Sequence, residues 1–499
     1  MQAVCKNMKT IQITEIDNVA VALHPIAKGE KIEAGGQVIE TLEDIPQGHK
    51  ISVRSIQSGE NIIKYGFPIG HALADVKPGT WMHTHNMKTN LEGEMEYSYQ
   101  PDLHYPKPVE PEVFQGYQRK DGRAAIRNEI WVIPTVGCVN DVARKIVKDN
   151  QDLVSGTIDG LYTFPHPFGC SQTGHDHAQT RKLLAALVRH PNAAAVLVVG
   201  LGCENLTHEQ FLAELGEYDP DRVKFLICQQ VEDEFAKARK LLEECAEYAS
   251  QFQRETIPIS ELVIGMKCGG SDGLSGITAN PTVGRFSDMM TARGGSTVLT
   301  EVPEMFGAEG LLMNRCADET VFAKAVDMIN GFKNYFISHH EVVYDNPSPG
   351  NKQGGITTLE DKSCGCVQKG GTAPIMDVIG YGDQVVTKGL NMLYGPGNDL
   401  VSATAMTAAG AHMILFTTGR GTPFGAPAPT LKIATNSQLA ARKKGWIDFD
   451  AGPVADGESI ESAAQRLLKM VIDVAGGRKT RAEELGFREI SIFKDGVVL

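Results

Sequence analysis

Two histidines stand two residues apart in the stretch MHTHN, residues 82–86. If this stretch continues as a β-strand, His83 and His85 project from the same face and can share one metal ion. Neutral imidazoles suit iron, manganese or zinc, and an acidic or thiolate ligand would be needed beside them. Two solvated histidines at a sheet edge are the simpler alternative. The spacing therefore predicts part of a metal site and leaves its third ligand undetermined.

A second group of reactive side chains lies in PHPFGCSQTGHDH, residues 165–177. It places His166, Cys170 and His175 between an apparent strand and an apparent helix. A histidine that a neighbouring carboxylate orients can act as a general base, and a thiol can bind a metal. In the alternative, Asp176 caps the next helix and the histidines only face water. The stretch is predicted to contribute to an active site.

Two glycine-rich stretches, CGGSDGLSGITANP (268–281) and SCGCVQKGG (363–371), carry thiols and small polar groups. Backbone N–H groups in such turns can bind a carboxylate or a phosphate, and Ser271, Asp272 and Lys369 could bind hydroxyls or charge. Neither a complete GxGxxG after a strand nor a GxxxxGK[ST] loop occurs. The strongest sequence signals of a dinucleotide or nucleoside triphosphate enzyme are therefore missing.

The elements that must position these groups divide the chain in three. Residues 1–97 repeat a short pattern of apolar residues around turn glycines, which predicts a small all-β domain of hairpins. Residues 98–115 are rich in proline and predict a linker. In residues 116–499, apolar runs alternate with helical stretches, which predicts an α/β, Rossmann-like region with glycine-rich C-terminal loops. A division of this region into two subdomains near residue 350 is left open.

Several apolar runs of this α/β region end in a cysteine, as in IWVIPTVGC, LYTFPHPFGC, VLVVGLGC and LVIGMKC. Ligands of open α/β sheets bind outside the carboxyl ends of the strands. We therefore expect Cys138, Cys170, Cys203 and Cys268 to crowd one rim of a sheet and to mark the active-site edge.

The composition limits the possible partners. The chain has 499 residues, 42% of them apolar, and a net charge of −13, which argues against nucleic acid or an anionic membrane as partner. The N-terminus resembles no signal peptide, and no stretch of 18 apolar residues could cross a bilayer. We expect a cytoplasmic enzyme with reduced thiols that acts on a small molecule. Enzymes of this size are often oligomeric, which leaves a homo-oligomer open.

Longer stretches of the chain resemble one family. DNVAVAL (17–23), GENIIKYGFPIGHALADV (59–76) and HTHNMKTNL (83–91) resemble the N-terminal SAF-type, or β-clip, domain of the altronate/galactarate dehydratases. Their larger C-terminal region is similar to GYQRKDGRAAIRN, FGCSQTG, GLGCEN, KCGGSDGLSGITANP and TTGRGTPFG. The resemblance covers nearly the whole chain.

The resemblance implies a hydro-lyase that converts D-altronate to 2-keto-3-deoxy-D-gluconate and water with Fe²⁺ or Mn²⁺. The alternative is galactarate dehydratase or another lyase of the family that eliminates a β-substituent from a 2-hydroxy acid. The metal association favours His83 and His85 as ligands, with Cys170 as a further candidate.

Eliminating water from such an acid requires a base, an acid and groups that bind the carboxylate and hydroxyls. We expect His175, or failing that His166, to transfer protons. Because a guanidinium matches a carboxylate at two points, we expect Arg127 and Arg420 to bind substrate. Asn86, Asn128, Ser271 and Asp272 complete the candidates for substrate binding.

The sequence is also compatible with two other classes of protein. In the first, cysteines such as the CxC pair Cys364 and Cys366 hold an iron–sulfur cluster. In the second, the β domain binds a sugar and the rest of the chain is a scaffold without activity.

Overall fold

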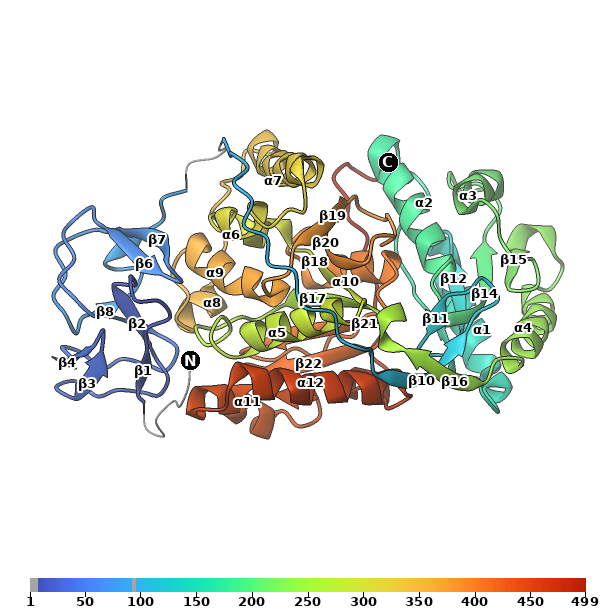
Figure 1. The fold of residues 1–499 in the computed structure, drawn as a ribbon. Helices are drawn as coiled ribbons and strands as arrows, with labels where there is room; N and C mark the ends of the chain where they lie inside the picture. Colours follow the sequence, from blue (N-terminus) through green and yellow to red (C-terminus); the bar gives the residue numbers. More distant parts are fainter. Residues whose placement is uncertain (1–7, 92–95) are drawn as a thin grey trace.

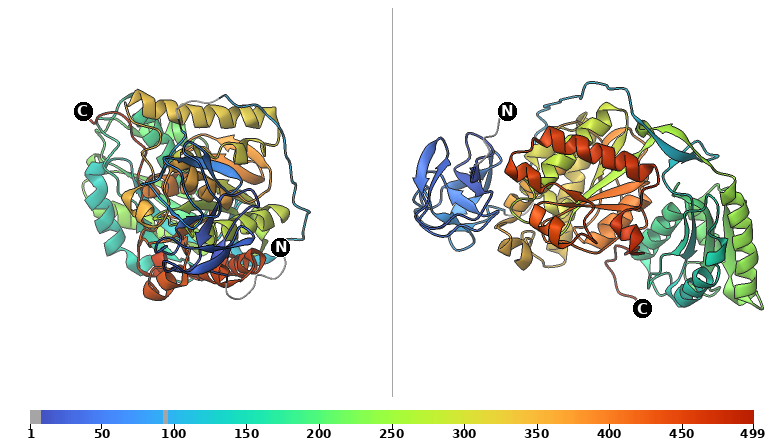
Figure 2. Two further views of the ribbon diagram at one scale, coloured as in Figure 1. Left: turned by 90° about the vertical axis from the view of Figure 1, so that its left-hand side faces the viewer. Right: turned by 90° about the horizontal axis from the view of Figure 1, so that it is seen from below.

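The computed structural model describes residues 8–91 and 96–499. Three parts lie in a row (Figure 1): a small β domain at one end, a seven-stranded sheet with its helices in the middle, and a smaller α/β unit at the other end. Figure 2 shows the same order from below. None of the helices in the described residues is both long and apolar enough to cross a bilayer.

The N-terminal part is strand-rich, as predicted. Its strands form three small sheets of order β1-β2-β5-β8, β3-β4 and β6-β7-β9, with antiparallel neighbours. The turn glycines Gly29, Gly48, Gly59 and Gly79 all have φ between 79° and 86°, the left-handed region that favours glycine. The strands are β1 (Thr10–Ile11), β2 (Val19–Ala22), β3 (Lys31–Ala34), β4 (Gln37–Glu40), β5 (Lys50–Ser52), β6 (Asn61–Lys64), β7 (Phe67–Ala72), β8 (Trp81–Met82) and β9 (Met87–Lys88).

The proline-rich segment after this domain runs along the middle part without regular structure up to β10 (Val113–Gln118). The Asp102 N–H donates to the Asn314 carbonyl at 2.8 Å, and the Val109 N–H donates to the Ala292 carbonyl at 2.8 Å. These contacts attach the segment to the surface of the middle part.

The smaller α/β unit contains a parallel four-stranded sheet of order β13-β12-β14-β15. Its elements are β12 (Glu129–Pro134), α1 (Asn140–Asp149), β13 (Gly160–Thr163), α2 (Gly174–Val188), β14 (Ala193–Gly200), α3 (His208–Leu215), β15 (Val223–Ile227) and α4 (Glu234–Ser250). A three-stranded sheet joins this unit to the middle part; it contains β10, β11 (Ala124–Ala125) and β16 (Arg254–Pro258).

The middle part is a parallel sheet of order β19-β20-β18-β17-β21-β22-β23. Its strands are β17 (Val263–Cys268), β18 (Ser296–Leu299), β19 (Ile375–Ile379), β20 (Gly389–Leu393), β21 (Met413–Thr418), β22 (Thr430–Ala434) and β23 (Phe449–Asp450). Its helices are α5 (Ala279–Ala292), α6 (Gly310–Met313), α7 (Glu319–Ser338), α8 (Pro349–Gln353), α9 (Leu359–Cys366), α10 (Asp399–Ala408), α11 (Ser437–Arg442), α12 (Ile460–Ala475) and α13 (Arg481–Glu484). Short 3₁₀ segments, η5 (Val302–Met305) and η6 (Val367–Gly370), follow β18 and α9.

Apolar packing joins the three parts. One hydrophobic cluster contains Ile62 and Met87 of the β domain together with Phe306 and Leu359 of the middle part. Another contains residues of α2 and α10, so these two helices pack between the two parallel sheets. The strand ends of the middle sheet are thereby fixed relative to both neighbours.

The expectation of one rim crowded by four cysteines is wrong, because the strands concerned belong to two different sheets. Cys138, Cys170 and Cys203 follow β12, β13 and β14, whereas Cys268 ends β17. The apolar runs of these strands have similar compositions, so the sequence did not indicate which sheet each strand joins. The predicted domain limits stay predictions; strands of the seven-stranded sheet occur both before and after residue 350.

Candidate metal centre and active-site cavity

Three buried side chains converge at the carboxyl end of β17. The sulfurs of Cys268 and Cys366 lie 3.3 Å apart, and each lies 3.1 Å from Oε2 of Glu304. Among the described residues, this is the one group of three or more cysteine, histidine or acidic side chains with ligand atoms that all lie within 4.8 Å of one another. Two thiols and a carboxylate form a donor set that can hold a divalent transition metal.

Three different elements bring these ligands together. Cys268 is the last residue of the fully buried part of β17, Glu304 lies in η5, and Cys366 ends α9. Glu301, just before η5, adopts the left-handed conformation with φ 70°, which is unfavourable for a glutamate. Its carboxylate accepts a hydrogen bond from the Cys268 N–H at 3.0 Å. The strained turn therefore places the Glu301 carboxylate against the Cys268 N–H and the Glu304 carboxylate against the Cys268 thiol.

Three lysines surround the group. The Lys369 ammonium donates to the Cys268 sulfur and to Glu301, both at 2.9 Å, and Lys362 pairs with Glu304 at 2.7 Å. Lys267 pairs with Glu301 at 2.9 Å and with Asp399 at 2.6 Å. Burial alone would raise the pKa of Glu304, but Lys362 and Lys369 lower it to about 2, so this ligand is ionised at neutral pH.

The charges of this cluster match a divalent cation. The three lysines balance the carboxylates of Glu301, Glu304 and Asp399 when both thiols are neutral. The hydrogen bond with Cys268 and burial raise the pKa of the Cys366 thiol well above its ordinary value. Two thiolates would add two negative charges, which a divalent cation neutralises. The residues present therefore fit such an ion.

A cavity of about 540 Å³ opens at this group. Cys268, Glu304, Lys362 and Asp399 line it, together with Gly269 and Gly270. A methyl group added at Gly269 would lie 2.5 Å from the Asp399 carboxylate, so only glycine fits between the strand end and that side chain. The remaining lining includes aromatic rings, short polar side chains and one further carboxylate: Phe332, Tyr335, Phe336, Phe493, Asn346, Ser348, Asn351, Asn398 and Asp345. The size and lining suit a small polar substrate.

The β domain docks next to this cavity. Its Lys50 and Lys64 donate to the two carboxylate oxygens of the buried Asp361 of α9 at 2.7 and 2.9 Å. A methyl group added at Gly273 would lie 1.8 Å from the Gly48 carbonyl oxygen, so the two backbones are in direct contact. The domain therefore buttresses α9, the helix that carries Cys366.

The predicted histidine pair lies in a turn and not in a strand. Strand β8 ends at Met82, because the Asn86 side chain accepts a hydrogen bond from the His83 N–H and donates to the Trp81 carbonyl. His83 Nε2 lies 2.9 Å from the Lys352 carbonyl oxygen, so the ring N–H donates to α8. The His85 ring packs against Trp81. The turn thus contacts the middle part close to the cavity, and Asn86 stabilises the turn.

Three other predicted residues gather around α8, where β17 and β21 end. Ser271 accepts a hydrogen bond at its carbonyl oxygen from Asn351, and its buried hydroxyl has no partner within the described part of the chain. Asp272 accepts hydrogen bonds from Ser275 and Thr435, and burial raises its pKa. Arg420 donates to the Gly350 carbonyl at 3.3 Å. These residues gather at the carboxyl edge of the middle sheet, and their role in substrate binding stays a prediction.

The remaining predicted residues lie away from this centre. Cys170, His166 and His175 belong to the smaller α/β unit, at the opposite end of the molecule from β8 (Figure 1). Within one chain, Cys170 is therefore not brought to His83 and His85. Arg127 is buried in an ion pair with Glu483 at 2.8 Å, and Asn128 binds Arg119 and backbone carbonyls. The structure thus assigns both of them contacts that hold the fold.

His166 is a poor candidate for proton transfer in this arrangement. Its Nε2 bonds the Pro134 carbonyl at 2.8 Å and its Nδ1 accepts from the Phe168 N–H, so both ring nitrogens are occupied. Burial lowers its pKa to about 4. His175 is exposed in the first turn of α2 and contacts Gln179; it lines a separate cavity with Arg181, Glu214 and Tyr381. The sequence alone could not predict where His166 and His175 lie relative to the candidate metal centre.

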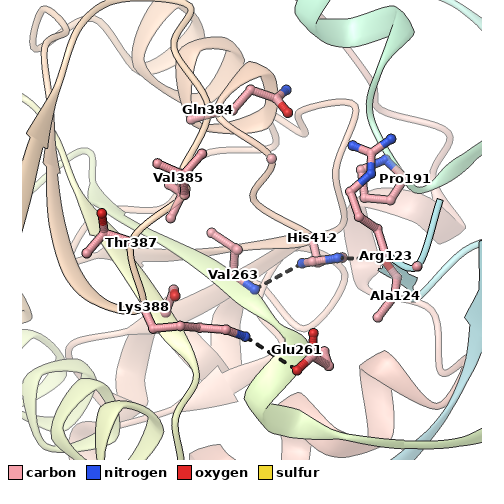
Figure 3. A pocket seen from close by; sticks show the side chains of 15 residues that line it. Arg123, Ala124, Pro191, Glu261, Val263, Gln384, Val385, Thr387, Lys388 and His412 are labelled. Carbon is pink, nitrogen blue, oxygen red and sulfur yellow. Dashed lines mark hydrogen bonds and ion pairs between the residues drawn. The ribbon is translucent and has the colours of Figure 1, made fainter. Parts of the chain in front are cut away.

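Another cavity of about 180 Å³ lies at the opposite edge of the middle sheet, where β17 starts (Figure 3). His412 accepts there from the Val263 N–H and donates to the Ala124 carbonyl, and Lys388 pairs with Glu261. These polar groups satisfy one another, and the amino ends of parallel strands are not where such sheets bind ligands. The cavity is therefore not the candidate active site.

A parallel sheet whose carboxyl edge carries ionised groups and a group that could hold a metal, next to a small polar cavity, is typical of an enzyme that acts on small molecules. Three family models match the chain: the altronate/galactarate dehydratase SAF domain at residues 8–90, the D-galactarate dehydratase/altronate hydrolase second domain at 116–250, and the D-galactarate/altronate dehydratase C-terminal domain at 259–498. The chain belongs to the D-galactarate/altronate dehydratase family, which confirms the resemblance seen in the sequence and the prediction of a hydro-lyase.

Individual relatives lie along almost the whole chain. Altronate dehydratase of Escherichia coli is 51% identical over 99% of this chain and 100% of its own length. Altronate dehydratase of Bacillus subtilis is 51% identical over 98% of this chain and 99% of its own. Galactarate dehydratase (L-threo-forming) of Escherichia coli is 32% identical over 98% of this chain and 97% of its own.

The sequence did not predict all members of the candidate metal centre. It singled out Cys268, Cys366 and Lys369 as members of suggestive stretches, but it did not relate them to one another. Glu301, Glu304 and Lys362 carry no local signal, since single charged residues in EVPEMFG and EDKSCGC are common in loops and helices. A strand-end cysteine together with the CxC pair was the one usable hint.

Proposed function

We propose that the chain dehydrates D-altronate to 2-keto-3-deoxy-D-gluconate at the cavity beside Cys268, Glu304 and Cys366. The convergence of these three side chains, of which Cys268 and Glu304 line a polar cavity at the carboxyl edge of β17, is the observation that carries the proposal. The 51% identity to the two altronate dehydratases supports this substrate over galactarate, since the galactarate enzyme is 32% identical.

We further propose that Cys268, Glu304 and Cys366 hold the Fe²⁺ or Mn²⁺ that the sequence led us to expect. When bound there, such an ion supplies Lewis acidity toward the substrate oxygens. Thiolate ligands favour Fe²⁺ over Mn²⁺. Lys369 and Glu301 fix the Cys268 side chain and backbone, and so orient one ligand.

Lys362 and Asp399 are placed for the proton transfers. Lys362 lines the cavity, pairs with Glu304 and donates to the Asn346 side chain at 3.0 Å; its ammonium can give a proton to the departing C3 hydroxyl. Asp399 lies against Gly269, and Lys267 holds one of its oxygens. The other oxygen is available to take the proton from C2 of the substrate.

The charge of the cavity supports a substrate with one carboxylate. Lys362 is the one basic side chain among its described lining residues, and Asp345 and Asp399 add negative charge. The second carboxylate of galactarate would lie among aromatic rings and acidic groups. The hydroxymethyl group at the same end of altronate is uncharged and needs only hydrogen bonds there. This asymmetry favours altronate.

His83, His85, Ser271, Asp272 and Arg420 stay candidates for closing the site around substrate, since they lie where the β domain meets the cavity edge. The contacts found for Cys170, His166, His175, Arg127 and Asn128 give these residues no role in it. The Rossmann-like class, the cytoplasmic location and a homo-oligomer remain proposals; the parallel order of both sheets supports the first.

Turnover of D-altronate and of galactarate by metal-stripped protein, supplied anaerobically with Fe²⁺ or Mn²⁺, tests the proposal. We expect metal-dependent 2-keto-3-deoxy-D-gluconate from altronate and at least 10-fold less turnover of galactarate. Equal or faster turnover of galactarate would refute the substrate, and full activity without metal would refute the role of the ion.

A further inference from the structure

The smaller α/β unit carries a second set of cysteines that the proposed dehydration does not use. Cys138 follows β12, Cys170 follows β13 and Cys203 follows β14, each within a few residues of the strand's carboxyl end. Cys138 and Cys203 are exposed and Cys170 is half-buried. Thiols of structural importance are normally buried, so three accessible thiols on adjacent strand ends call for another explanation.

The strand order puts these thiols where such sheets bind ligands. The order β13-β12-β14-β15 means that the chain reverses direction across the sheet between β12 and β14. In open parallel sheets the crevice at this reversal, outside the carboxyl ends, is the usual ligand site. Cys138 and Cys203 follow the two strands that flank it, and Cys170 follows the next strand.

Hydrogen bonds lock the three cysteine loops together. The Gly137 N–H donates to the Phe168 carbonyl at 2.8 Å, which joins the loops of Cys138 and Cys170. The Leu206 N–H donates to the Gly169 carbonyl at 3.0 Å, which joins the loops of Cys170 and Cys203. The Asn205 side chain accepts from both the Cys170 thiol at 3.4 Å and the Ser171 N–H at 2.7 Å. The loops therefore form one preorganised edge.

The backbone and one side chain at this edge indicate a ligand. Ser171 adopts the left-handed conformation with φ 56°, a strain that folded chains keep mainly at functional sites. Gln172 is 3% exposed, and its Nε2 has no hydrogen-bond partner within the described residues, although its Oε1 accepts from the Gly169 N–H. An unused buried donor next to Cys170 suits a ligand that brings acceptor atoms, such as sulfide.

The spacing of the thiols argues against a single ion. Cys138, Cys170 and Cys203 do not form a group with all ligand atoms within 4.8 Å, a condition that Cys268, Glu304 and Cys366 do meet in the described structure. One ion would need such a compact group, whereas a four-iron cluster holds its cysteine sulfurs farther apart. We propose that Cys138, Cys170 and Cys203 bind an iron–sulfur cluster at the switch point of the smaller sheet.

In this site each thiol gives up its proton and binds one iron as thiolate, and the fourth iron takes a ligand from outside these three residues. Cys228, which follows β15, is not part of it. Like Cys170, it is half-buried against an apolar cluster, but burial raises the pKa of its thiol to about 11. It therefore serves as a matched control on the same sheet edge.

Iron and acid-labile sulfide in anaerobically purified full-length protein, before and after reconstitution with Fe²⁺ and sulfide, test the inference. We expect about four irons and four sulfides per chain beyond the single ion of the candidate metal centre, with broad visible absorption that dithionite bleaches. Cys138→Ser, Cys170→Ser and Cys203→Ser should each lose most of the sulfide, whereas Cys228→Ser and Cys366→Ser should retain it.

The alternative results overturn the inference. Absence of sulfide in the reconstituted wild-type protein would do so, and so would sulfide that survives in the triple serine variant. One iron or zinc per chain without sulfide, lost in the same variants, would replace the cluster by a single ion.

Unchanged far-UV circular dichroism and melting temperature would exclude unfolding of the variants. Loss of altronate turnover in Cys366→Ser with sulfide intact would separate this site from the proposed active centre.

Discussion

Cys268 and Cys366 are 98 residues apart in the chain, yet their sulfurs lie 3.3 Å from each other across the carboxylate of Glu304. A strand end and a helix end thus meet at one point of the middle sheet. The surrounding lysines lower the pKa of Glu304, whereas the contact with Cys268 and burial raise the pKa of the Cys366 thiol, so Cys366 has to lose a proton when a cation binds.

Removing either thiol should abolish metal retention at the candidate metal centre. Cys268→Ser and Cys366→Ser each replace a soft ligand by a hydroxyl, so we expect at least about 100-fold lower kcat/KM for altronate and the loss of about one iron per chain after gel filtration, with sulfide unchanged. Metal analysis and turnover on the same samples check this. Cys316→Ser is the control, because Cys316 is equally buried but lies outside the group. Full iron content in both variants would contradict the assignment.

The histidine pair gives a contrasting prediction. His83→Ala and His85→Ala should leave iron content unchanged, because neither ring lies in the compact ligand group. Loss of the His83 contact with the Lys352 carbonyl should loosen the β domain and raise KM for altronate by several-fold. Iron content and KM measured together distinguish the roles; loss of iron with unchanged KM would restore the histidines as ligands.

The sequence could predict the types of element better than their meeting points. Turn glycines at 29, 48, 59 and 79 and the buried run of β17 follow from local patterns. The prediction of a strand at MHTHN was wrong, because the Asn86 side chain accepts a hydrogen bond from the His83 N–H and closes a turn. The alternation of residue types along the sequence does not reveal such a local hydrogen bond. Glu304 contacts Cys366 only through long-range packing of η5 on α9, and no spacing rule encodes such a contact.

The docking of the β domain depends on one buried carboxylate. Asp361→Asn leaves Lys50 and Lys64 buried without a counter-charge, so we expect a loss of about 3–5 kcal/mol in the stability of the docked state. Urea unfolding and limited proteolysis of the 98–115 segment check this. Asp149→Asn breaks the exposed pair with Lys145 and should cost less than about 1 kcal/mol. Equal effects of the two substitutions would refute the buried role of Asp361.

Removal of the cavity's lysine should affect substrate binding and chemistry together. Lys362→Met leaves Glu304 without its nearest cation and takes away the proposed proton donor, so we expect kcat to fall at least about 100-fold and the pKa of Glu304 to rise. Lys362→Arg keeps the positive charge, so we expect its KM for altronate to stay closer to the wild-type value than its kcat does. The comparison requires kcat and KM for both variants; a Lys362→Met enzyme with normal kcat would exclude the lysine from proton transfer.

Buried neutral histidines should make the fold sensitive to mild acid. Burial lowers the pKa of His166 and of His412 to about 4, whereas unfolded histidine titrates near 6.5. Between these values the unfolded chain binds more protons than the folded one, so stability is complete above pH 6.5 and falls as the pH drops toward 4. At pH 5 each histidine should cost about 2 kcal/mol. We expect urea midpoints to fall between pH 7 and 5, and to fall less in His166→Gln; equal decreases in both proteins would contradict the assignment of His166.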